Sequence, residues 1–182
     1  TTLTLVVFTS DHGDFNWQLG LGKKDLVLYD ALLRVPCLIR APGNASQGRT
    51  SHALTEHADL FPTILDLAGL RAPPLSAQGR SFAAVVRGET ETHREDTLAT
   101  ICPPHFTCEY PDHAAFRRAW EDQHAVPGTP LAFTAPYNVP GIFTRSLRTR
   151  EWRYVWYRDG FEELYHLPSD PAEERSVARD AG

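Results

Sequence analysis

A short apolar run that ends abruptly on polar residues constrains this 182-residue chain more than any other feature. Residues 3–8 read LTLVVF, and Thr9-Ser10 and then Asp11-His12-Gly13 follow at once. Nearly continuous apolar runs of this length are typical of parallel strands buried on both faces. We therefore expect residues 3–10 to form a buried strand of an α/β sheet. Gly13 then allows the sharp turn that the chain needs after such a strand.

The position of this run bears on the origin of the chain. The sequence contains no Met, and the predicted strand begins at the third residue. A buried central strand is an unusual place for a protein to begin. We expect the chain to be the later part of a longer polypeptide.

Composition excludes several classes of function. The hydrophobic content is 42% and the charged content 23%, which is typical of a globular domain. The net charge is -5 and the basic residues are scattered, so nothing indicates a nucleic-acid partner. No segment reaches the length of a membrane span, and none of these 182 residues reads as part of a signal peptide. Three Cys residues slightly favour a reducing compartment, the cytoplasm, although any signal peptide would lie in the missing N-terminal part.

The first half of the chain predicts alternating helices and strands. We expect a helix over residues 25–33 with Asp25 as its N-cap, and a strand over residues 35–41. The clearest helix covers residues 59–70, capped by Asp59, with Pro62 in its first turn and Gly69 ending it. Ser81 is expected to cap a short helix that ends at Gly88. These elements predict the α/β class.

The second half has a different character. Residues 90–142 carry many prolines and are expected to form an irregular insertion; residues 89–96, where it begins, are charged and expected to be exposed. Residues 143–149, 152–157 and 163–167 read as three short strands joined by tight turns, which predicts an antiparallel meander. A final helix is expected after Ser169. The predicted division is 1–89, 90–142 and 143–182.

Asp11 and His12 are the first candidate site residues. In open α/β sheets, ligands bind beyond the carboxyl ends of the parallel strands, where this pair is expected. A carboxylate and an imidazole placed there can face one divalent cation. The alternative is structural: Asp11 caps the loop, and His12 is a hydrogen-bonded surface residue.

An ordered set of motifs resembles the sulfatase family of the alkaline phosphatase superfamily. The first half supplies the Asp11-His12-Gly13 turn, the Tyr29-Asp30 pair and the HADLFPTILDLAG segment from His57 to Gly69. The second half supplies the motifs SLRT at 146–149, WRY at 152–154 and ELYHL at 163–167, followed by Asp170-Pro171 and Glu173. The resemblance covers residues 3–89 and 143–178 and leaves residues 90–142 unplaced.

The resemblance implies a fold and a reaction. It implies the later strands of a mainly parallel sheet with flanking helices, followed by a small antiparallel C-terminal subdomain. Sulfatases hydrolyse sulfate esters with a formylglycine nucleophile and one divalent metal ion, with calcium favoured and Mn, Mg or Zn as alternatives. Asp11 and His12 match two of the metal ligands. Lys24 matches the lysine that contacts the sulfate, and Lys23 is the alternative because the spacing varies by a residue.

Part of the implied site is missing from the chain. The formylglycine motif Cys-x-Pro-x-Arg and the other two metal ligands are expected N-terminal to residue 1. The segment Cys102-Pro103-Pro104-His105-Phe106 is a near miss, since Phe106 stands where Arg is required. This polypeptide alone is therefore expected to be inactive.

The resemblance also implies partners and leaves rival functions open. The expected partners are a sulfate ester or sulfated glycan and the missing N-terminal half, with no nucleic acid and no membrane. One rival is a phosphonate monoester or phosphodiester hydrolase of the same superfamily. Another is a non-catalytic, sulfatase-like binding domain.

Overall fold

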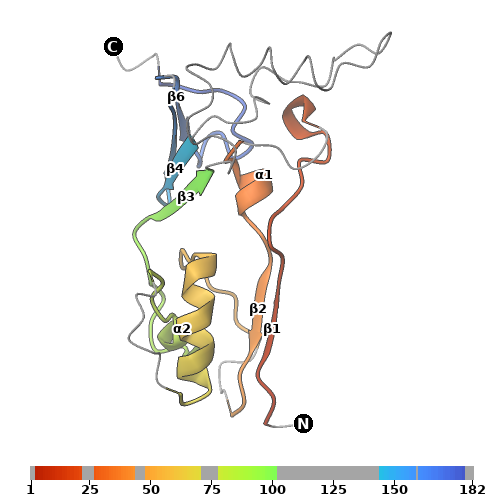
Figure 1. Cartoon of the computed structure of the whole chain (residues 1–182), viewed down its shortest axis with the longest axis vertical. Helices are drawn as coiled ribbons and strands as arrows, with labels where there is room; N and C mark the ends of the chain where they lie inside the picture. The colour runs from red at the N-terminus through yellow and green to blue at the C-terminus, as the bar shows by residue number, and fades with distance from the viewer. Residues whose placement is uncertain are drawn as a thin grey trace, which may run out of the picture. The chain divides into compact units, whose positions relative to one another are not determined.

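The structure is a computed structural model that describes residues 3–21, 27–43, 48–70, 78–101, 144–158 and 160–178. The chain divides into two compact units (Figure 1). Unit 1 combines Thr1–Ser10 with Pro36–Thr97, and unit 2 combines Asp11–Val35 with Leu98–Gly182. The three-part division expected from the sequence stays a prediction.

Unit 1 contains a two-stranded sheet. β1 (Val6–Thr9) pairs antiparallel with β2 (Cys37–Arg40), with Val6 opposite Arg40 and Thr9 opposite Cys37. Both predicted strands are confirmed. The expectation that the first strand is parallel and buried on both faces is wrong for the described residues, because Val6 is 44% exposed and Phe8 60% exposed. The reason is that β2 is the only strand paired with β1 in the described ranges.

The longest described helix, α2 (His57–Leu67), begins earlier and ends earlier than expected. Its N-cap is Glu56, and Asp59 is the third helical residue, where its Oδ2 accepts a hydrogen bond of 2.9 Å from the Glu56 N–H. The prediction that Asp59 is the N-cap is therefore wrong by three positions. The helix ends at Leu67 rather than Leu70, but the predicted role of Gly69 in ending it is confirmed: Gly69 is left-handed, and the Leu70 N–H donates to the Leu65 carbonyl as in a Schellman motif.

Pro62 lies in the second turn of α2 rather than the first. Because proline has no backbone N–H, the Ala58 carbonyl lacks the hydrogen bond that residue 62 would otherwise donate. The backbone of Gly79 packs directly against this carbonyl group. A Cβ at Gly79 would overlap the Ala58 carbonyl group and lie 2.9 Å from the Asp59 nitrogen. The backbone of residue 79 can therefore approach α2 only because it is a glycine.

Asp59 is fully buried and is the main polar anchor of unit 1. Its carboxylate accepts hydrogen bonds from the Arg80 N–H at 2.8 Å and from Nε and Nη2 of Arg94 at 2.7 and 2.5 Å. His93 Nε2 lies 3.1 Å from Asp59 Oδ2. The side chains of His93 and Arg94 are almost completely buried. The expectation that the whole 89–96 stretch is exposed is therefore wrong for these two residues.

The short helix of unit 1, α3 (Ala83–Arg87), ends at the left-handed Gly88, as expected. Its N-cap is Phe82 rather than Ser81. Ser81 nevertheless accepts a 3.2 Å hydrogen bond from the Ala83 N–H through its hydroxyl.

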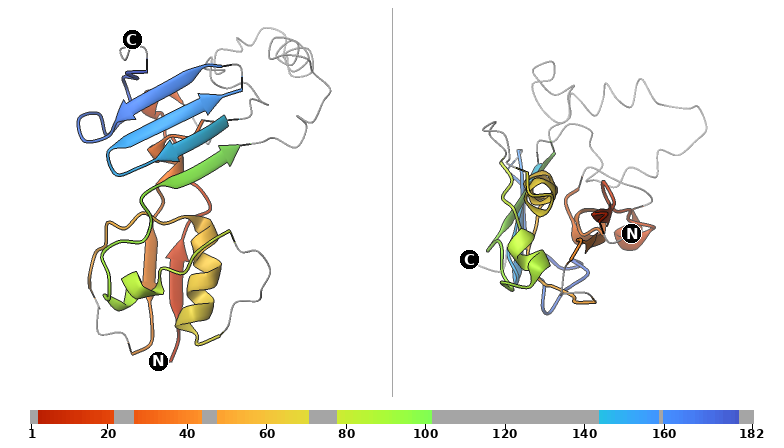
Figure 2. Two further views of the ribbon diagram at one scale, coloured as in Figure 1. Left: turned by 90° about the vertical axis from the view of Figure 1, so that its left-hand side faces the viewer. Right: turned by 90° about the horizontal axis from the view of Figure 1, so that it is seen from below.

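Unit 2 is built on a four-stranded sheet. β3 (Thr97–Ile101, whose first residue belongs to unit 1), β4 (Thr144–Arg148), β5 (Trp152–Tyr157) and β6 (Glu162–His166) lie side by side in this order (Figure 2). β4, β5 and β6 are joined antiparallel, which confirms the predicted meander. The strand β3 was not expected, since it lies in the stretch predicted to be irregular. Residues 102–142 of that stretch lie outside the described residues.

One face of this sheet packs against the segment that follows the Asp11-His12-Gly13 turn. That face carries Arg153, Val155 and Tyr157 of β5, and the core also contains Phe15, Leu21, Val27, Tyr29, Leu32, Tyr165 and Leu167. The predicted helix over 25–33 is reduced to α1 (Asp30–Leu33), with Tyr29 rather than Asp25 as N-cap. Val27, Leu28 and Tyr29 are all buried and not helical, and three consecutive buried residues do not fit a helix that is apolar on one side only.

The helix expected after Ser169 is absent from the described residues 170–178. Glu173 has a left-handed backbone with φ of 57°, and its buried side chain turns toward α1. The Val177 N–H then bonds to the Leu164 carbonyl at 2.8 Å. The segment is therefore held by the tertiary contacts of Glu173 in place of the predicted helical hydrogen bonds. None of the helices in the described ranges has the length and apolarity to cross a membrane.

Candidate metal turn and the charged cluster beneath it

The turn after β1 brings the two candidate ligands together. Asp11 and His12 have side chains 84% and 38% exposed, and the His12 Nε2 lies 3.5 Å from Asp11 Oδ2. Asp11 Oδ1 also accepts a 3.0 Å hydrogen bond from the His12 N–H. Two ligand atoms held by one cation at about 2.3 Å and at right angles lie about 3.3 Å apart. The spacing of the pair therefore fits two neighbouring positions of a coordination shell.

The hydrogen bond of His12 assigns its tautomer. Nδ1 lies 2.7 Å from the Gly13 carbonyl oxygen, which can only accept a hydrogen bond. In the neutral ring the proton is then on Nδ1, and Nε2 keeps its lone pair. Histidines that bind metals are commonly oriented by such a bond from the other ring nitrogen.

Gly13 fixes the turn to the helix α1. Its N–H donates a 2.7 Å hydrogen bond to the Leu32 carbonyl. A Cβ on residue 13 would overlap the Ala31 carbonyl group and lie 3.2 Å from Leu32 Cα. A glycine is therefore needed because of close approach, and the position of the turn depends on that of α1.

As a metal site, the turn is incomplete within the described residues, which contain no group of three or more His, Cys, Asp or Glu side chains arranged to hold a metal ion. Two ligands are fewer than Ca²⁺, Mg²⁺ or Zn²⁺ take up in proteins. Asp11 and His12 thus fit a divalent cation chemically, as half of a site.

Lys23 and Lys24 lie outside the described residues, so their roles stay predictions. The residues on either side of their segment, Leu21 and Val27, are both buried in the core of unit 2. Between the turn and the lysines, three non-glycine residues have positive φ: Asn16 at 44°, Trp17 at 70° and Leu19 at 54°. Backbone strain of this kind is concentrated at functional sites and requires surrounding structure to maintain it.

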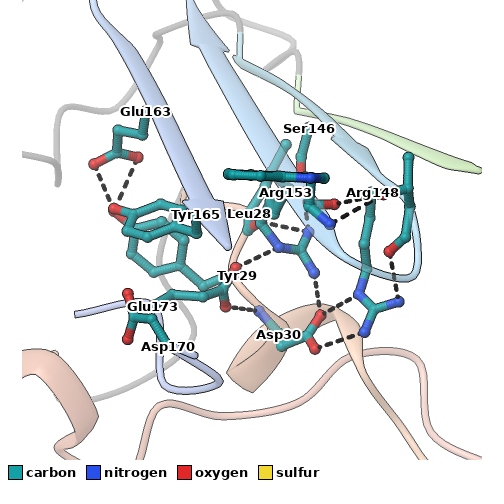
Figure 3. Close-up of polar contacts among 12 residues, drawn as sticks. Leu28, Tyr29, Asp30, Ser146, Arg148, Arg153, Glu163, Tyr165, Asp170 and Glu173 are labelled. Atoms are coloured by element: carbon teal, nitrogen blue, oxygen red, sulfur yellow. Dashed lines mark hydrogen bonds and ion pairs between the residues drawn. The ribbon is translucent and has the colours of Figure 1, made fainter. Parts of the chain in front are cut away.

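A cluster of charged residues connects α1 to β4, β5 and the C-terminal segment (Figure 3). Arg153, which is 1% exposed, forms ion pairs with Asp30 and Glu173. Its Nη1 donates to Ser146 Oγ at 2.8 Å and to the Leu28 carbonyl at 3.1 Å. Arg148 adds hydrogen bonds of 3.1 and 3.3 Å to the two carboxylate oxygens of Asp30.

Glu173 completes this cluster from the C-terminal segment. Its Oε2 accepts a 2.6 Å hydrogen bond from the Asp30 N–H, so Asp30 is held through both its side chain and its backbone. Burial raises the pKa of Glu173, although the adjacent Arg153 opposes this rise. We name Asp30, Arg148, Arg153 and Glu173 the α1 charge cluster.

A second buried group surrounds Glu163. Its carboxylate accepts hydrogen bonds from the Tyr29 hydroxyl at 2.8 and 3.0 Å and from the Tyr157 hydroxyl at 2.8 Å. Burial, together with the nearby negative charge of Glu163, raises the pKa of Tyr29 and Tyr157 well above the ordinary value. The cluster therefore holds neutral tyrosines around one carboxylate.

The residues of both clusters lie in motifs that the sequence analysis recognised, but their roles in buried charge pairs were not predicted. A usable signal was present: Arg153 and Glu163 occupy the inward, alternating positions of strands whose neighbouring inward residues are apolar. A charged residue at such a position requires a buried partner.

Comparison with known proteins gives a consistent result. The sulfatase family profile matches residues 3–70. The chain is 29% identical over 180 residues to the delta 4,5-hexuronate-2-O-sulfatase of Bacteroides thetaiotaomicron, covering 97% of this chain and 31% of that protein. It is 28% identical over 179 residues to human arylsulfatase K, covering 96% of this chain and 28% of the relative.

Solved structures agree. A 2-O GAG sulfatase superposes with a TM-score of 0.71 at 25% identity, covering 97% of this chain and 32% of that one. The phosphonate monoester hydrolase of Agrobacterium radiobacter superposes with a TM-score of 0.69 at 26% identity, covering 98% of this chain and 31% of that one. The fold is therefore the alkaline phosphatase-like sulfatase fold. The chain spans about a third of the length of the curated relatives that it matches; its residues 3–70 match the sulfatase family profile, and it is similar to sulfatases over nearly all of its own length.

Proposed function

We propose that this chain is part of a sulfatase-type hydrolase that cleaves sulfate esters with a bound divalent metal ion. The observation that carries the proposal is the Asp11-His12 turn. It presents a carboxylate and the Nε2 of an imidazole, which the Gly13 carbonyl orients through Nδ1, side by side at the end of β1. The match of residues 3–70 to the sulfatase family supports the same reading.

Each residue of the proposed site has one task. Asp11 and His12 would hold the cation, which when bound polarises the sulfuryl oxygens and offsets negative charge. Lys24, or Lys23 in its place, would supply a fixed positive charge to the sulfate group. Calcium is the metal expected from the family, while the imidazole nitrogen of His12 suits Mn²⁺ or Zn²⁺ better. The formylglycine nucleophile is expected outside these 182 residues.

The proposed substrate class is a sulfated glycan. One relative is named for a hexuronate sulfate, another for N-acetylglucosamine-6-sulfate, and one solved neighbour is in complex with D-glucosamine-2-N,6-O-disulfate. A sulfated sugar is an anionic ester, which suits a site built from a cation and a lysine.

A phosphonate monoester hydrolase is the second candidate. Two such enzymes superpose on this chain with TM-scores of 0.69 and 0.70 at 26% identity, comparable with the sulfatases. Two steps separate the sulfatase from the phosphonate monoester hydrolase. The DNA upstream of the Thr1 codon is sequenced, and the protein encoded by the extended reading frame is then assayed on an aryl sulfate and on a phosphonate monoester. A Cys-x-Pro-x-Arg motif after an acidic strand, with faster cleavage of the sulfate, supports our proposal. An upstream region without that motif favours a non-catalytic domain.

The metal turn is testable in the chain itself. We expect a low concentration of paramagnetic Mn²⁺ to broaden the NMR signals of Asp11 and His12 before others. The ring signals of His52 and His166 serve as internal controls. The variant Asp11→Asn combined with His12→Ala should lose the selective broadening. Equal broadening of His12 and the control histidines would contradict the assignment of this turn.

Turnover provides the second test. The purified 182-residue chain should not hydrolyse an aryl sulfate above background, with or without Ca²⁺, because the described residues supply only two ligands and the chain lacks the expected nucleophile motif. Robust hydrolysis that survives repeated purification would contradict the proposed location of the nucleophile.

A further inference from the structure

The α1 charge cluster does more than fill space in unit 2. Arg153 is fully buried against two carboxylates, a carbonyl and a hydroxyl, and the other inward-facing residues of its strand are Val155 and Tyr157. For stability alone, apolar residues of similar volume serve as well as or better than a buried ion pair. Charged hydrogen bonds, however, define distance and direction, which apolar packing does not.

The target of these contacts is one residue, Asp30. Arg148 from β4 and Arg153 from β5 reach its carboxylate, and Glu173 accepts from its backbone N–H. Asp30 is the first residue of the single-turn helix α1. Fixing it at both side chain and backbone fixes the orientation of that turn relative to the sheet.

The opposite end of α1 carries the metal turn. Gly13 donates to the Leu32 carbonyl at 2.7 Å and lies too close to Ala31 for any larger residue. The Gly13 carbonyl in turn orients the ring of His12. A continuous series of contacts therefore connects β4 and β5 to the imidazole of His12 through Asp30, α1 and Gly13, all within unit 2.

Glu173 gives an independent indication. Its backbone has φ of 57°, in the left-handed region that a non-glycine residue enters only at a cost. Its buried carboxylate contacts the Asp30 N–H and Arg153. The fold therefore accepts local strain to complete the contacts that hold Asp30.

We propose that the α1 charge cluster holds the Asp11-His12 pair in position, acting through Asp30 and Gly13. The inference rests on the proposed function of that pair. Its physical content, that the sheet of unit 2 sets the geometry of the turn, can be measured without metal or substrate.

Hydrogen exchange of the Gly13 amide in the whole chain tests this inference. In the variant Asp30→Asn, which keeps the shape of the side chain but removes its charge, we expect Gly13 to exchange about tenfold faster or more. Amides of the β5–β6 pairing should change less than about threefold. A purely structural role would raise both sets together.

His12 supplies a second readout. We expect its ring nitrogen signals to move away from the pattern of a single Nδ1-protonated tautomer in Asp30→Asn, because the Gly13 carbonyl loses its fixed position. Replacing the exposed Asp66, which pairs with Arg87 in unit 1, by Asn is the matched control. It should leave both the Gly13 and the His12 signals unchanged.

If Asp30→Asn does not fold, Arg148→Gln replaces it, since Arg148 is 20% exposed and its loss leaves Arg153 in place. The same pattern is expected with a smaller increase at Gly13. Unchanged Gly13 exchange in a folded variant, or an increase equal to that of the β5–β6 amides, overturns the inference. Failure of the proposed function would instead appear as absent Mn²⁺ broadening at Asp11 and His12 in the unmodified chain.

Discussion

The variant Asp59→Asn should destabilise unit 1 far more than its conservative chemistry suggests. Asp59 is fully buried and accepts hydrogen bonds from two backbone N–H groups and from two nitrogens of Arg94. Asparagine keeps the volume but has one acceptor oxygen and an NH₂ group that faces donors. The variant therefore leaves Arg94 buried without a full counter-charge.

The size of the effect follows from two considerations. Burial alone would raise the pKa of Asp59, but the hydrogen bonds from Arg94, Arg80 and Glu56 outweigh it and lower the pKa from 3.8 to about 2. A difference of this size corresponds to about 2 kcal/mol of stability at neutral pH. Removing one partner of a buried pair costs about 3–5 kcal/mol, which is the loss we expect.

The sign of the pH dependence is fixed by the direction of the pKa shift. A carboxylate whose pKa is lowered on folding stabilises the folded state fully above its unfolded pKa of 3.8. That contribution is lost as the pH falls through about 2. The acid sensitivity of unit 1 between these values should therefore be weaker in Asp59→Asn than in the unmodified chain.

Urea unfolding followed by far-ultraviolet circular dichroism measures the change, because α2 lies in unit 1 and none of the four Trp residues does. The midpoint should fall without a change in m value. Asp66→Asn on the same helix is the matched control. Asp66 is 42% exposed, and its pair with Arg87 is expected to contribute less than about 1 kcal/mol. Equal losses for the two variants would refute the argument that burial and donor number decide the cost.

Two further predictions concern packing and alkaline pH. Gly79→Ala should cost about 1–3 kcal/mol in the same unfolding assay, because its methyl group would overlap the Ala58 carbonyl; an unchanged midpoint would contradict this. Tyr29, Tyr157 and Tyr165 should stay protonated until unit 2 unfolds, because burial raises the pKa of all three, so stability should fall as the pH rises above about 10. Near-ultraviolet absorbance that shows these residues titrating in the folded protein would contradict this.

Local sequence signals located most of the elements. The strands of the meander were predicted within two residues because apolar alternation and turn residues act over short distances. The end of α2 was predicted at Gly69 because a left-handed residue there terminates a helix regardless of its surroundings. The family and the Asp11-His12 turn were likewise visible as a pattern of residues.

Predictions failed where distant contacts outweighed local preference. Residues 27–29 lie in the segment predicted to be helical, yet they are not helical: all three are buried, and the Leu28 carbonyl accepts a hydrogen bond from Arg153, 125 positions away. The expected helix after Ser169 gives way to the strained Glu173, whose partners are Asp30 and Arg153. In both cases a buried charge determined the backbone.

The sequence by itself thus determined which residues are apolar, where the chain turns and which pair of ligands follows β1, because each of these depends on neighbours a few positions away. Only the tertiary structure decided that Arg148, Arg153 and Glu173 meet at Asp30, and that Gly13 lies against the other end of the same helical turn. The physical reason is that a buried charge must be paired. Its partner is chosen by proximity in space, over sequence separations for which no local pattern exists.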